Sequence, residues 1–247
     1  MNTGAQIHCG VDDGIATLEL QQPAKGNALS AQAVEALIAA VDEAVSRNDV
    51  HTLVLGGAGR HFCTGFDLSD LDDESDASLL HRFVRIELLL QRLWTAPVRT
   101  VAIAHGRTWG AGADLMTACD LRLGLDDTQV RFPGAGFGLV LGTARLAARV
   151  GGDRAWRMAV ESTSLDAAAA LDTGLLSMRL DSLDRDAWLA CLPPPAVDRT
   201  TMAALRAAVA SAGDAELATL VRSAARPGLK ARIEAYRARQ LQARAAR

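Results

Sequence analysis

The stretch HGRTWGAGADLMTACD, residues 105–120, combines four very small residues with a single acid. Residues 110–113 carry at most a methyl group each, and Asp114 follows them directly, before two apolar residues. Small residues let backbone N–H groups approach a ligand, and a helix that begins here presents free N–H groups and the positive end of its dipole. Such a place suits a phosphate or a carbonyl oxygen that becomes an oxyanion. Tight packing of a helix against a strand is the alternative explanation for the small residues.

Familiar phosphate and metal motifs are missing from the sequence. GAGADL lacks the third glycine of a dinucleotide-binding loop, and neither GxxxxGK[ST] nor GxSxG occurs anywhere. The five histidines have no metal-ligand spacing. We therefore expect no metal site and no bound cofactor.

Composition narrows the class of protein further. The chain has 247 residues, 49% of them hydrophobic, which is enough for one large core with an appendage. The net charge of -3 argues against a nucleic-acid partner. No apolar run reaches the roughly 20 residues of a membrane span, and the N-terminus does not resemble a signal peptide. We therefore expect no membrane association. The four cysteines are scattered, which favours reduced thiols and a cytoplasmic location.

Strand and helix patterns alternate on both sides of the opening stretch. Residues 6–20 predict two strands around an Asp-Gly turn, and apolar spacing from Ser30 predicts a helix with Ser30 as its N-cap. HTLVLGG and VRTVAIA are typical of buried strands, with a helix between them. The acidic segment DLDDESDAS is interpreted as a mobile loop or a solvated helix start. Alternation of this kind indicates the α/β class.

The last part of the chain differs from the rest. Three consecutive prolines at 193–195 mark a stiff break, and Ala- and Arg-rich helix follows from about Thr200. We predict a core over residues 1–190 and a C-terminal helical region over residues 191–247, suited to docking or oligomerisation.

Four segments together resemble the enoyl-CoA hydratase/isomerase (crotonase) superfamily. RHFCTGFDLSDL is similar to that family's F-C-x-G-x-D-L, and the stretch from Pro97 to Leu123 is similar to its P-V-I-A-A-V-x-G-x-A-x-G-G-G-x-E-L-A-x-x-C-D-x-R. KGNALS and LDAAAALDTGLL resemble its x-x-N-A-L-S and A-x-x-A-x-x-x-G-L-V. The matches occur in order from about residue 6 to 180, which makes the set specific.

The resemblance implies a fold and a ligand. The fold is an α/β spiral of repeated ββα units with C-terminal helices that assemble homotrimers, often paired into hexamers. The ligand is an acyl-CoA thioester, in which coenzyme A is part of the substrate and not a separate cofactor.

The resemblance also implies site residues. The backbone N–H groups of Phe66, after Gly65, and of Ala111, after Gly110, would form an oxyanion hole. Positions matching the coenzyme A-binding segments are Lys25, Asn27, Ala28, Leu29, Thr64, Gly65, Phe66, Asp67, Leu68 and Gly110. Within this set Lys25 would cover the adenine, and Asp67 also suits a turn or cap.

The chain departs from the family at the acid–base positions. Hydratases use two glutamates, and here the first position is Asp114 while the second, after Pro133, is Gly134. A glycine cannot transfer a proton, so efficient two-carboxylate hydration is not expected. Asp114 is a catalytic acid–base candidate, or else a carboxylate favoured by the helix dipole. A second carboxylate would have to come from elsewhere, and the acids of the 72–76 segment are the candidates.

Several other residues have open interpretations. Trp109, Phe137, Leu139 and Val140 would line an acyl pocket or belong to the core, and Arg131 would pair with Asp114, bind a substrate carboxylate or lie at the surface. Two functions therefore remain: an enzyme acting on acyl-CoA thioesters, by hydration, isomerisation, decarboxylation or hydrolysis, and a non-catalytic acyl-CoA-binding protein or partner subunit with the same fold.

Overall fold

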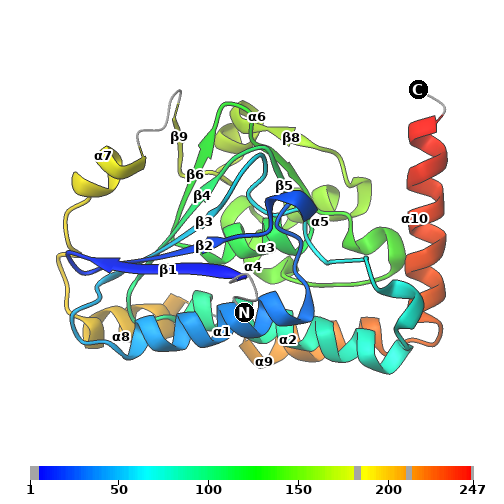
Figure 1. The fold of residues 1–247 in the computed structure, drawn as a ribbon, viewed down its shortest axis with the longest axis horizontal. Helices are drawn as coiled ribbons and strands as arrows, with labels where there is room; N and C mark the ends of the chain where they lie inside the picture. The colour runs from blue at the N-terminus through cyan, green and yellow to red at the C-terminus, as the bar shows by residue number, and fades with distance from the viewer. Residues whose placement is uncertain (1–5, 181–184, 210–212, 246–247) are drawn as a thin grey trace, which may run out of the picture.

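The computed structural model describes residues 6–180, 185–209 and 213–245. Its centre is a six-stranded sheet in the order β1-β2-β3-β4-β6-β9, in which only the β1–β2 pair is antiparallel (Figure 1). The strands are β1 (Ile7–Asp12), β2 (Ile15–Leu20), β3 (Thr52–Gly57), β4 (Arg99–Ala104), β6 (Leu121–Leu125) and β9 (Met178–Leu180). Strands β3 and β4 are buried almost throughout, which explains their continuous apolar sequences.

Two of these strands are each followed by a short strand of a second sheet. After β4 comes β5 (Arg107–Trp109), and after β6 comes β7 (Gln129–Arg131), which pairs with β5 in parallel. Strand β8 (Leu165–Asp166) adds to β7 in the antiparallel sense. The units β4–β5–α3 and β6–β7–α4 therefore repeat the strand-strand-helix pattern, which confirms the predicted α/β spiral.

Helices α1 (Ala31–Ser46) and α2 (Asp76–Thr95) run together beneath the large sheet (Figure 1). Ser30 is the predicted N-cap of α1, and its hydroxyl accepts the N–H of Ala33 at 3.1 Å. The remaining helices of the core are α3 (Ala111–Ala118), α4 (Thr143–Val150), α5 (Gly152–Glu161), α6 (Ala167–Asp172) and α7 (Arg185–Ala190), with short 3-10 turns η1 (Pro23–Lys25), η2 (Leu71–Asp73) and η3 (Gly134–Phe137).

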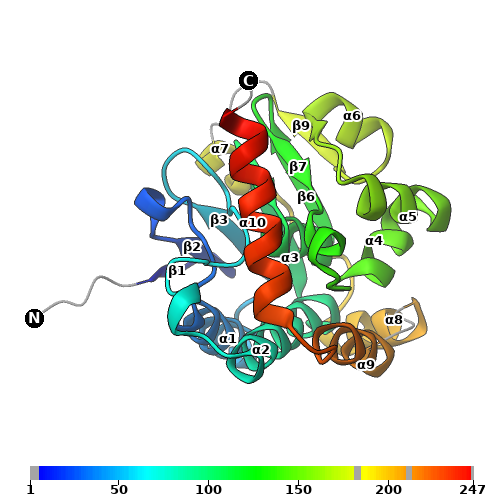
Figure 2. The same cartoon turned by 90° about the vertical axis from the view of Figure 1, so that its right-hand side faces the viewer.

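The C-terminal helices are α8 (Arg199–Val209), α9 (Gly213–Ala224) and α10 (Leu229–Ala245). Arg199 at the start of α8 donates to the carbonyl groups of Val45, Arg47 and Val50, at the end of α1 and just beyond it. Helix α9 packs on α2, and α10 crosses one end of the molecule between β1–β3 and α4–α5 (Figure 2). The predicted helical tail is thus docked on its own chain.

The acidic segment joins an exposed connection to the start of a helix. It contains the 3-10 turn η2, whose Leu71 is buried, and the first turn of α2. Ser75 and Ser78 form a reciprocal capping box at that helix start. The segment therefore contains both an exposed connection, which fits the predicted loop, and the predicted helix start.

Candidate active site

Two glycines bring two free backbone amides together at the start of α3. Gly65 and Gly110 both have positive φ, at 94° and 53°. A Cβ atom at Gly65 would lie 2.6 Å from the carbonyl oxygen of Trp109 and 3.4 Å from the amide nitrogen of Ala111, so no side chain fits there. In the described part of the chain the N–H groups of Phe66 and Ala111 have no hydrogen-bond acceptor. The structure therefore places the two predicted oxyanion donors on adjoining segments.

The loop that carries Phe66 is held by its neighbours. The N–H of Leu29 donates to the carbonyl of Gly65 at 2.7 Å, and the N–H of Asp67 donates to the carbonyl of Leu29 at 3.1 Å. The N–H of Trp109 donates to the carbonyl of Cys63 at 3.0 Å. These bonds use the carbonyl of Gly65 and the N–H of Asp67, and they leave the N–H of Phe66 free.

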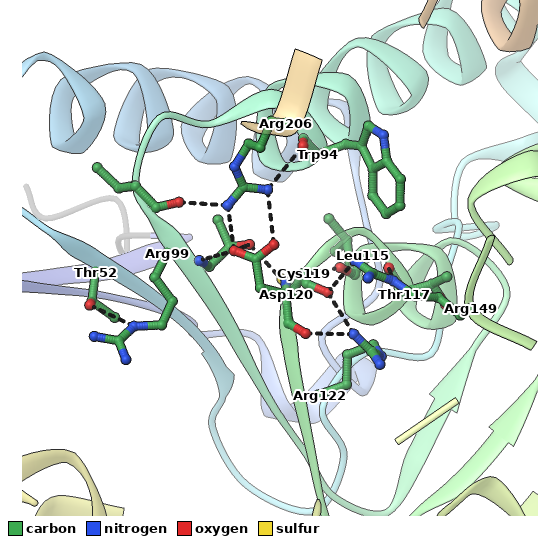
Figure 3. Close-up of polar contacts among 12 residues, drawn as sticks. Thr52, Trp94, Arg99, Leu115, Thr117, Cys119, Asp120, Arg122, Arg149 and Arg206 are labelled. Carbon is green, nitrogen blue, oxygen red and sulfur yellow. Dashed lines mark hydrogen bonds and ion pairs between the residues drawn. The ribbon is translucent and has the colours of Figure 1, made fainter. Parts of the chain in front are cut away.

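Arginine side chains hold the opposite end of α3 (Figure 3). Arg149 donates to the carbonyl groups of Thr117 and Cys119, at 3.2 and 2.8 Å, and Arg122 donates to those of Cys119 and Asp120, at 3.1 and 2.6 Å. These carbonyls are the orphan acceptors at a helix C-terminus, where positive charge is favourable. The helix that presents Ala111 is therefore anchored at its far end.

Asp114 lies in the first turn of α3 and is 5% exposed. Burial raises the pKa of its carboxyl well above the usual range, Arg145 opposes that rise, and Glu87 and Glu216 add to it. Within the described residues its Oδ1 atom has no hydrogen-bond partner. A Cβ atom at Gly142, where φ is 63°, would collide with that oxygen and lie 2.9 Å from Cγ. A glycine thus makes room for the acid.

Asp114 and the two amides line one cavity of about 900 Å³. The predicted residues Thr64, Gly65, Phe66, Leu68 and Gly110 also line it, as do the four apolar candidates Trp109, Phe137, Leu139 and Val140. The size matches that of small-molecule pockets.

The other predicted binding residues lie outside the cavity wall. Asn27 is buried and its side-chain amide donates to the carbonyls of Ala58 and His61, so it holds loops together. Lys25 reaches Asp67 at 3.5 Å, and Asp67 accepts from the N–H and hydroxyl of Ser69. Ala28 and Leu29 are buried in the same strip of chain.

No second carboxylate of the described chain reaches the cavity. Gly134 lines it at the position where the family has glutamate, and Asp114 is the one acid of the lining. Of the acids at 72–76, Glu74 pairs with Arg82 at 2.6 Å and Asp76 accepts the N–H groups of Gly228 and Lys230. The 72–76 segment therefore does not supply the missing group.

Sequence reasoning missed part of the site. One part is the buried charged set Glu87, Arg145 and Glu216 next to Asp114. Another is an aromatic row in which Phe66 stacks on Phe83 at 4.4 Å, followed by Phe137 and by Tyr236 of α10. A glutamate inside the apolar run of α2 was the available signal for the first part. For Tyr236 we find no sequence signal.

The described residues contain no group of His, Cys, Asp and Glu side chains that could hold a metal ion. Among those same residues, no helix has the length and apolar character needed to cross a bilayer.

Known proteins are similar to this chain in sequence. The family model described as enoyl-CoA hydratase/isomerase matches residues 10–219. A Mycobacterium leprae protein named "Probable enoyl-CoA hydratase echA6" is 35% identical over 185 residues, 72% of each chain. A Bos taurus protein named "Ethylmalonyl-CoA decarboxylase" is 31% identical over 179 residues, 70% of this chain and 58% of that one.

Solved structures agree with the sequence matches. An enoyl-CoA hydratase/isomerase structure from Bordetella parapertussis superposes with a TM-score of 0.90 at 41% identity, covering 94% of this chain and 98% of the other. An enoyl-CoA hydratase from Bacillus halodurans shares the fold, with a TM-score of 0.79 at 21% identity and coverage of 93% and 99%. The chain belongs to the enoyl-CoA hydratase/isomerase family.

Proposed function

We propose that the protein is an enzyme that binds acyl-CoA thioesters and stabilises the thioester enolate. The thioester oxygen would lie between the N–H groups of Phe66 and Ala111, and Asp114 would exchange a proton with the α-carbon. The observation that carries this proposal is the meeting of two acceptor-free amides and one buried acid at a single cavity.

The magnitudes support catalysis by so small a set of groups. One oxyanion donor contributes about 2.7–4 kcal/mol to the transition state. A positioned proton-transfer group contributes about 10²–10⁴-fold in rate. The N-terminus of α3 adds its dipole at the same point, since Ala111 is its first residue.

The coenzyme A moiety would leave the cavity past Thr64. This residue lines the cavity, its N–H donates to the carbonyl of Gly26 at 3.0 Å, and its hydroxyl donates to the carbonyl of Lys25 at 3.5 Å. The Lys25 side chain is 51% exposed, and in this proposal it would meet the nucleotide. Asn27, Ala28 and Leu29 would then support this route through their backbone.

A specific observation favours decarboxylation as the reaction. Arg131 lines the cavity, and in the described chain no carboxylate pairs with it. Its Nε atom donates to the carbonyl of Ser162 at 2.7 Å, and its guanidinium carbon lies 5.8 Å from the Trp109 ring centre. A cation placed there suits the free carboxylate of a 2-carboxyacyl thioester.

Decarboxylation also needs no general base. The bond from the α-carbon to the carboxylate breaks, CO₂ leaves, and the electron pair moves to the thioester oxygen in the oxyanion hole. The α-carbon then takes the proton of Asp114, which regains one from solvent. The absence of a carboxyl at Gly134 is no obstacle to this sequence, and one relative is named a decarboxylase of an ethylmalonyl thioester.

Two further expectations accompany the proposal. A homotrimer or a dimer of trimers would cover exposed apolar side chains such as Trp156, 64% exposed, and Leu241, 56% exposed. Light scattering on the purified protein measures the subunit number. The cytoplasmic location also stays a prediction.

Mass spectrometry of coenzyme A thioesters tests the function. The panel holds enoyl, β,γ-enoyl, aromatic and malonyl-type acyl groups, incubated with wild type, Asp114→Asn and the surface control Asp172→Asn. We expect loss of CO₂ from a malonyl-type member with wild type and the control, and a drop of about 10²-fold or more with Asp114→Asn.

Other outcomes are equally informative. Turnover that Asp114→Asn leaves unchanged would remove Asp114 from the mechanism. A change confined to enoyl groups would exclude decarboxylation. Tight binding of acyl-CoA without turnover of any member would favour the non-catalytic binding protein.

A further inference from the structure

Asp114 belongs to a buried cluster of four ionisable side chains. It comprises Asp114 of α3, Glu87 of α2, Arg145 of α4 and Glu216 of α9, and we call it the carboxylate cluster. All four residues are at most 8% exposed. Three carboxyl groups therefore share one guanidinium in the interior of the protein.

The hydrogen bonds are distributed unevenly within the carboxylate cluster. Arg145 contacts Glu87 through Nη2 and Glu216 through Nη1, each at 2.5 Å. The second oxygen of Glu216 accepts the N–H groups of Ala144 and Arg145, at 3.0 and 3.2 Å. Asp114 receives none of these donors. In the described chain its Oδ1 atom is without a partner, and so is Oε1 of Glu87, but the other oxygen of Glu87 accepts from Arg145.

The charges of the carboxylate cluster require that at least one of its three carboxyl groups binds a proton. Full ionisation would leave two uncompensated negative charges in an apolar environment, which is costly enough that buried groups neutralise instead. Donors stabilise the ionised form of a carboxyl, so the proton goes to the carboxyl that lacks them. Burial raises the pKa of Glu87 too, but Arg145 opposes that rise by charge and by hydrogen bonding, whereas Asp114 has the charge effect alone.

We propose that the carboxylate cluster keeps Asp114 protonated in the resting enzyme, so that it enters the reaction as a proton donor. Glu87, Arg145 and Glu216 are then positioning residues, which act through Asp114 without touching the substrate. The part that concerns the reaction rests on the proposed function, while the protonation of Asp114 does not.

This arrangement has a consequence for the reaction. A protonated Asp114 cannot begin by removing an α-proton, which isomerisation requires. It can protonate an enolate that the loss of CO₂ has already formed. Donation leaves the carboxylate cluster with two excess negative charges, so rapid uptake of a proton from solvent completes the cycle.

Carboxyl NMR tests the proposal without any substrate. The protein is labelled with ¹³C at the aspartate and glutamate carboxyl carbons, and Asp114→Asn identifies the Asp114 signal by its disappearance. We expect that signal to remain that of the neutral carboxylic acid at pH 7. In Glu216→Gln and in Glu87→Gln, loss of a negative neighbour shifts its titration to lower pH, whereas the exposed control Glu43→Gln leaves it in place.

Each possible result decides one part of the proposal. An Asp114 signal that is fully ionised at pH 7 in wild type overturns the protonated resting state, and a titration unmoved by both cluster variants overturns the positioning role. If one variant does not fold, the other still decides that role. Because no turnover is measured, failure of the proposed enzymatic function would leave this result readable.

Discussion

The two ends of α3 have opposite chemistry. At the N-terminal end, the carboxylate cluster sets three carboxyl groups against one guanidinium, and an oxygen of Asp114 has no donor in the described chain. At the C-terminal end, Arg122, Arg149 and Arg206 surround one carboxylate, Asp120, and backbone carbonyls (Figure 3). Both ends are buried in large part, yet the acceptors at the C-terminal end have many hydrogen-bond donors and those at the N-terminal end have few.

The arginine end has many hydrogen bonds, and among its described arginines only the Nε atom of Arg206 is buried without a partner. Besides the end of α3, Arg122 reaches the carbonyls of Leu175 and Gly174, at 2.6 and 3.4 Å. Arg206 joins both oxygens of Asp120 to the carbonyls of Trp94 and Val98. Burial lowers the pKa of Arg122 to about 10, which still leaves it charged at neutral pH.

The contrast distinguishes the end of α3 that supports the structure from the end that lies at the candidate active site. Buried polar groups are normally satisfied, and exceptions concentrate where a protein performs chemistry. The arginine end holds α3 in place, while the other end presents a buried acid beside two free amides. Four substitutions sharpen or break this contrast.

The largest expected effect is at the arginine end. Arg122→Met leaves up to three carbonyl groups without a side-chain donor, because Arg149 still donates to the carbonyl of Cys119, and the free energy of unfolding should fall by about 3 kcal/mol. Urea denaturation measures the change, with the exposed Arg154→Met as control. Equal stability of the two variants would mean that these bonds do not anchor α3.

The second effect adds an acid to the site end. A Cβ atom at Gly134 would meet only the carbonyl oxygen of Leu139 at 3.4 Å and its Cβ at 3.9 Å, so Gly134→Glu should be accommodated. A second carboxyl near the α-carbon should raise the hydration rate of a short enoyl-CoA about 10²-fold. The loss of enoyl absorbance follows the reaction. An unchanged rate would contradict the placement of the missing acid at Gly134.

The third effect is displacement of Asp114. Gly142→Ala pushes a methyl group against its Oδ1 atom, and we expect turnover to fall about 10-fold or more through misplacement. Gly151→Ala is the matched control, because φ is also positive there, at 83°, but no atom lies within 4 Å of the added Cβ. Both variants should lose about 1–3 kcal/mol of stability to backbone strain, the control more than Gly142→Ala, because φ 83° with ψ 154° is adopted almost only by glycine. Equal turnover losses would show that contact with Asp114 is irrelevant.

The smallest effect concerns stability and pH. Because the pKa of Asp114 is raised in the folded protein, the folded state binds its proton more tightly than the unfolded chain does. This contribution is fully present below about pH 4 and is lost as pH rises through the folded-state pKa. Asp114→Asn has no such dependence, so its melting temperature relative to wild type should increase from pH 5 to pH 8.

Calorimetry at several pH values gives that comparison directly. Asp172→Asn, a surface control, should show no such trend. A difference between wild type and Asp114→Asn that is constant with pH would contradict the raised pKa.

Local sequence predicted the part of the site that consists of short contiguous segments. Residues 64–68 and 110–114 lie together because their positive-φ glycines and small residues permit close approach of two backbones. The helix at Ser30 and the buried strands β3 and β4 were confirmed for the same local reasons. Strands β5, β8 and β9 were missed because two or three residues carry no period.

The carboxylate cluster could not be predicted in this way. Glu87, Arg145 and Glu216 lie on three helices far apart in sequence, and each is one of several charged residues on its helix. Such residues usually face water, and only packing of α2, α4 and α9 around α3 buries them. Their relation to Asp114 is a property of the tertiary structure.

A crystal structure with an acyl-CoA analogue that cannot be turned over tests the central claim most directly. We predict that the thioester oxygen lies about 2.7–3.1 Å from the amide nitrogens of both Phe66 and Ala111. The carboxyl of Asp114 should face the α-carbon, with the coenzyme A moiety passing Thr64 toward Lys25. A thioester bound elsewhere, or bound with its oxygen away from both amides, would contradict the account.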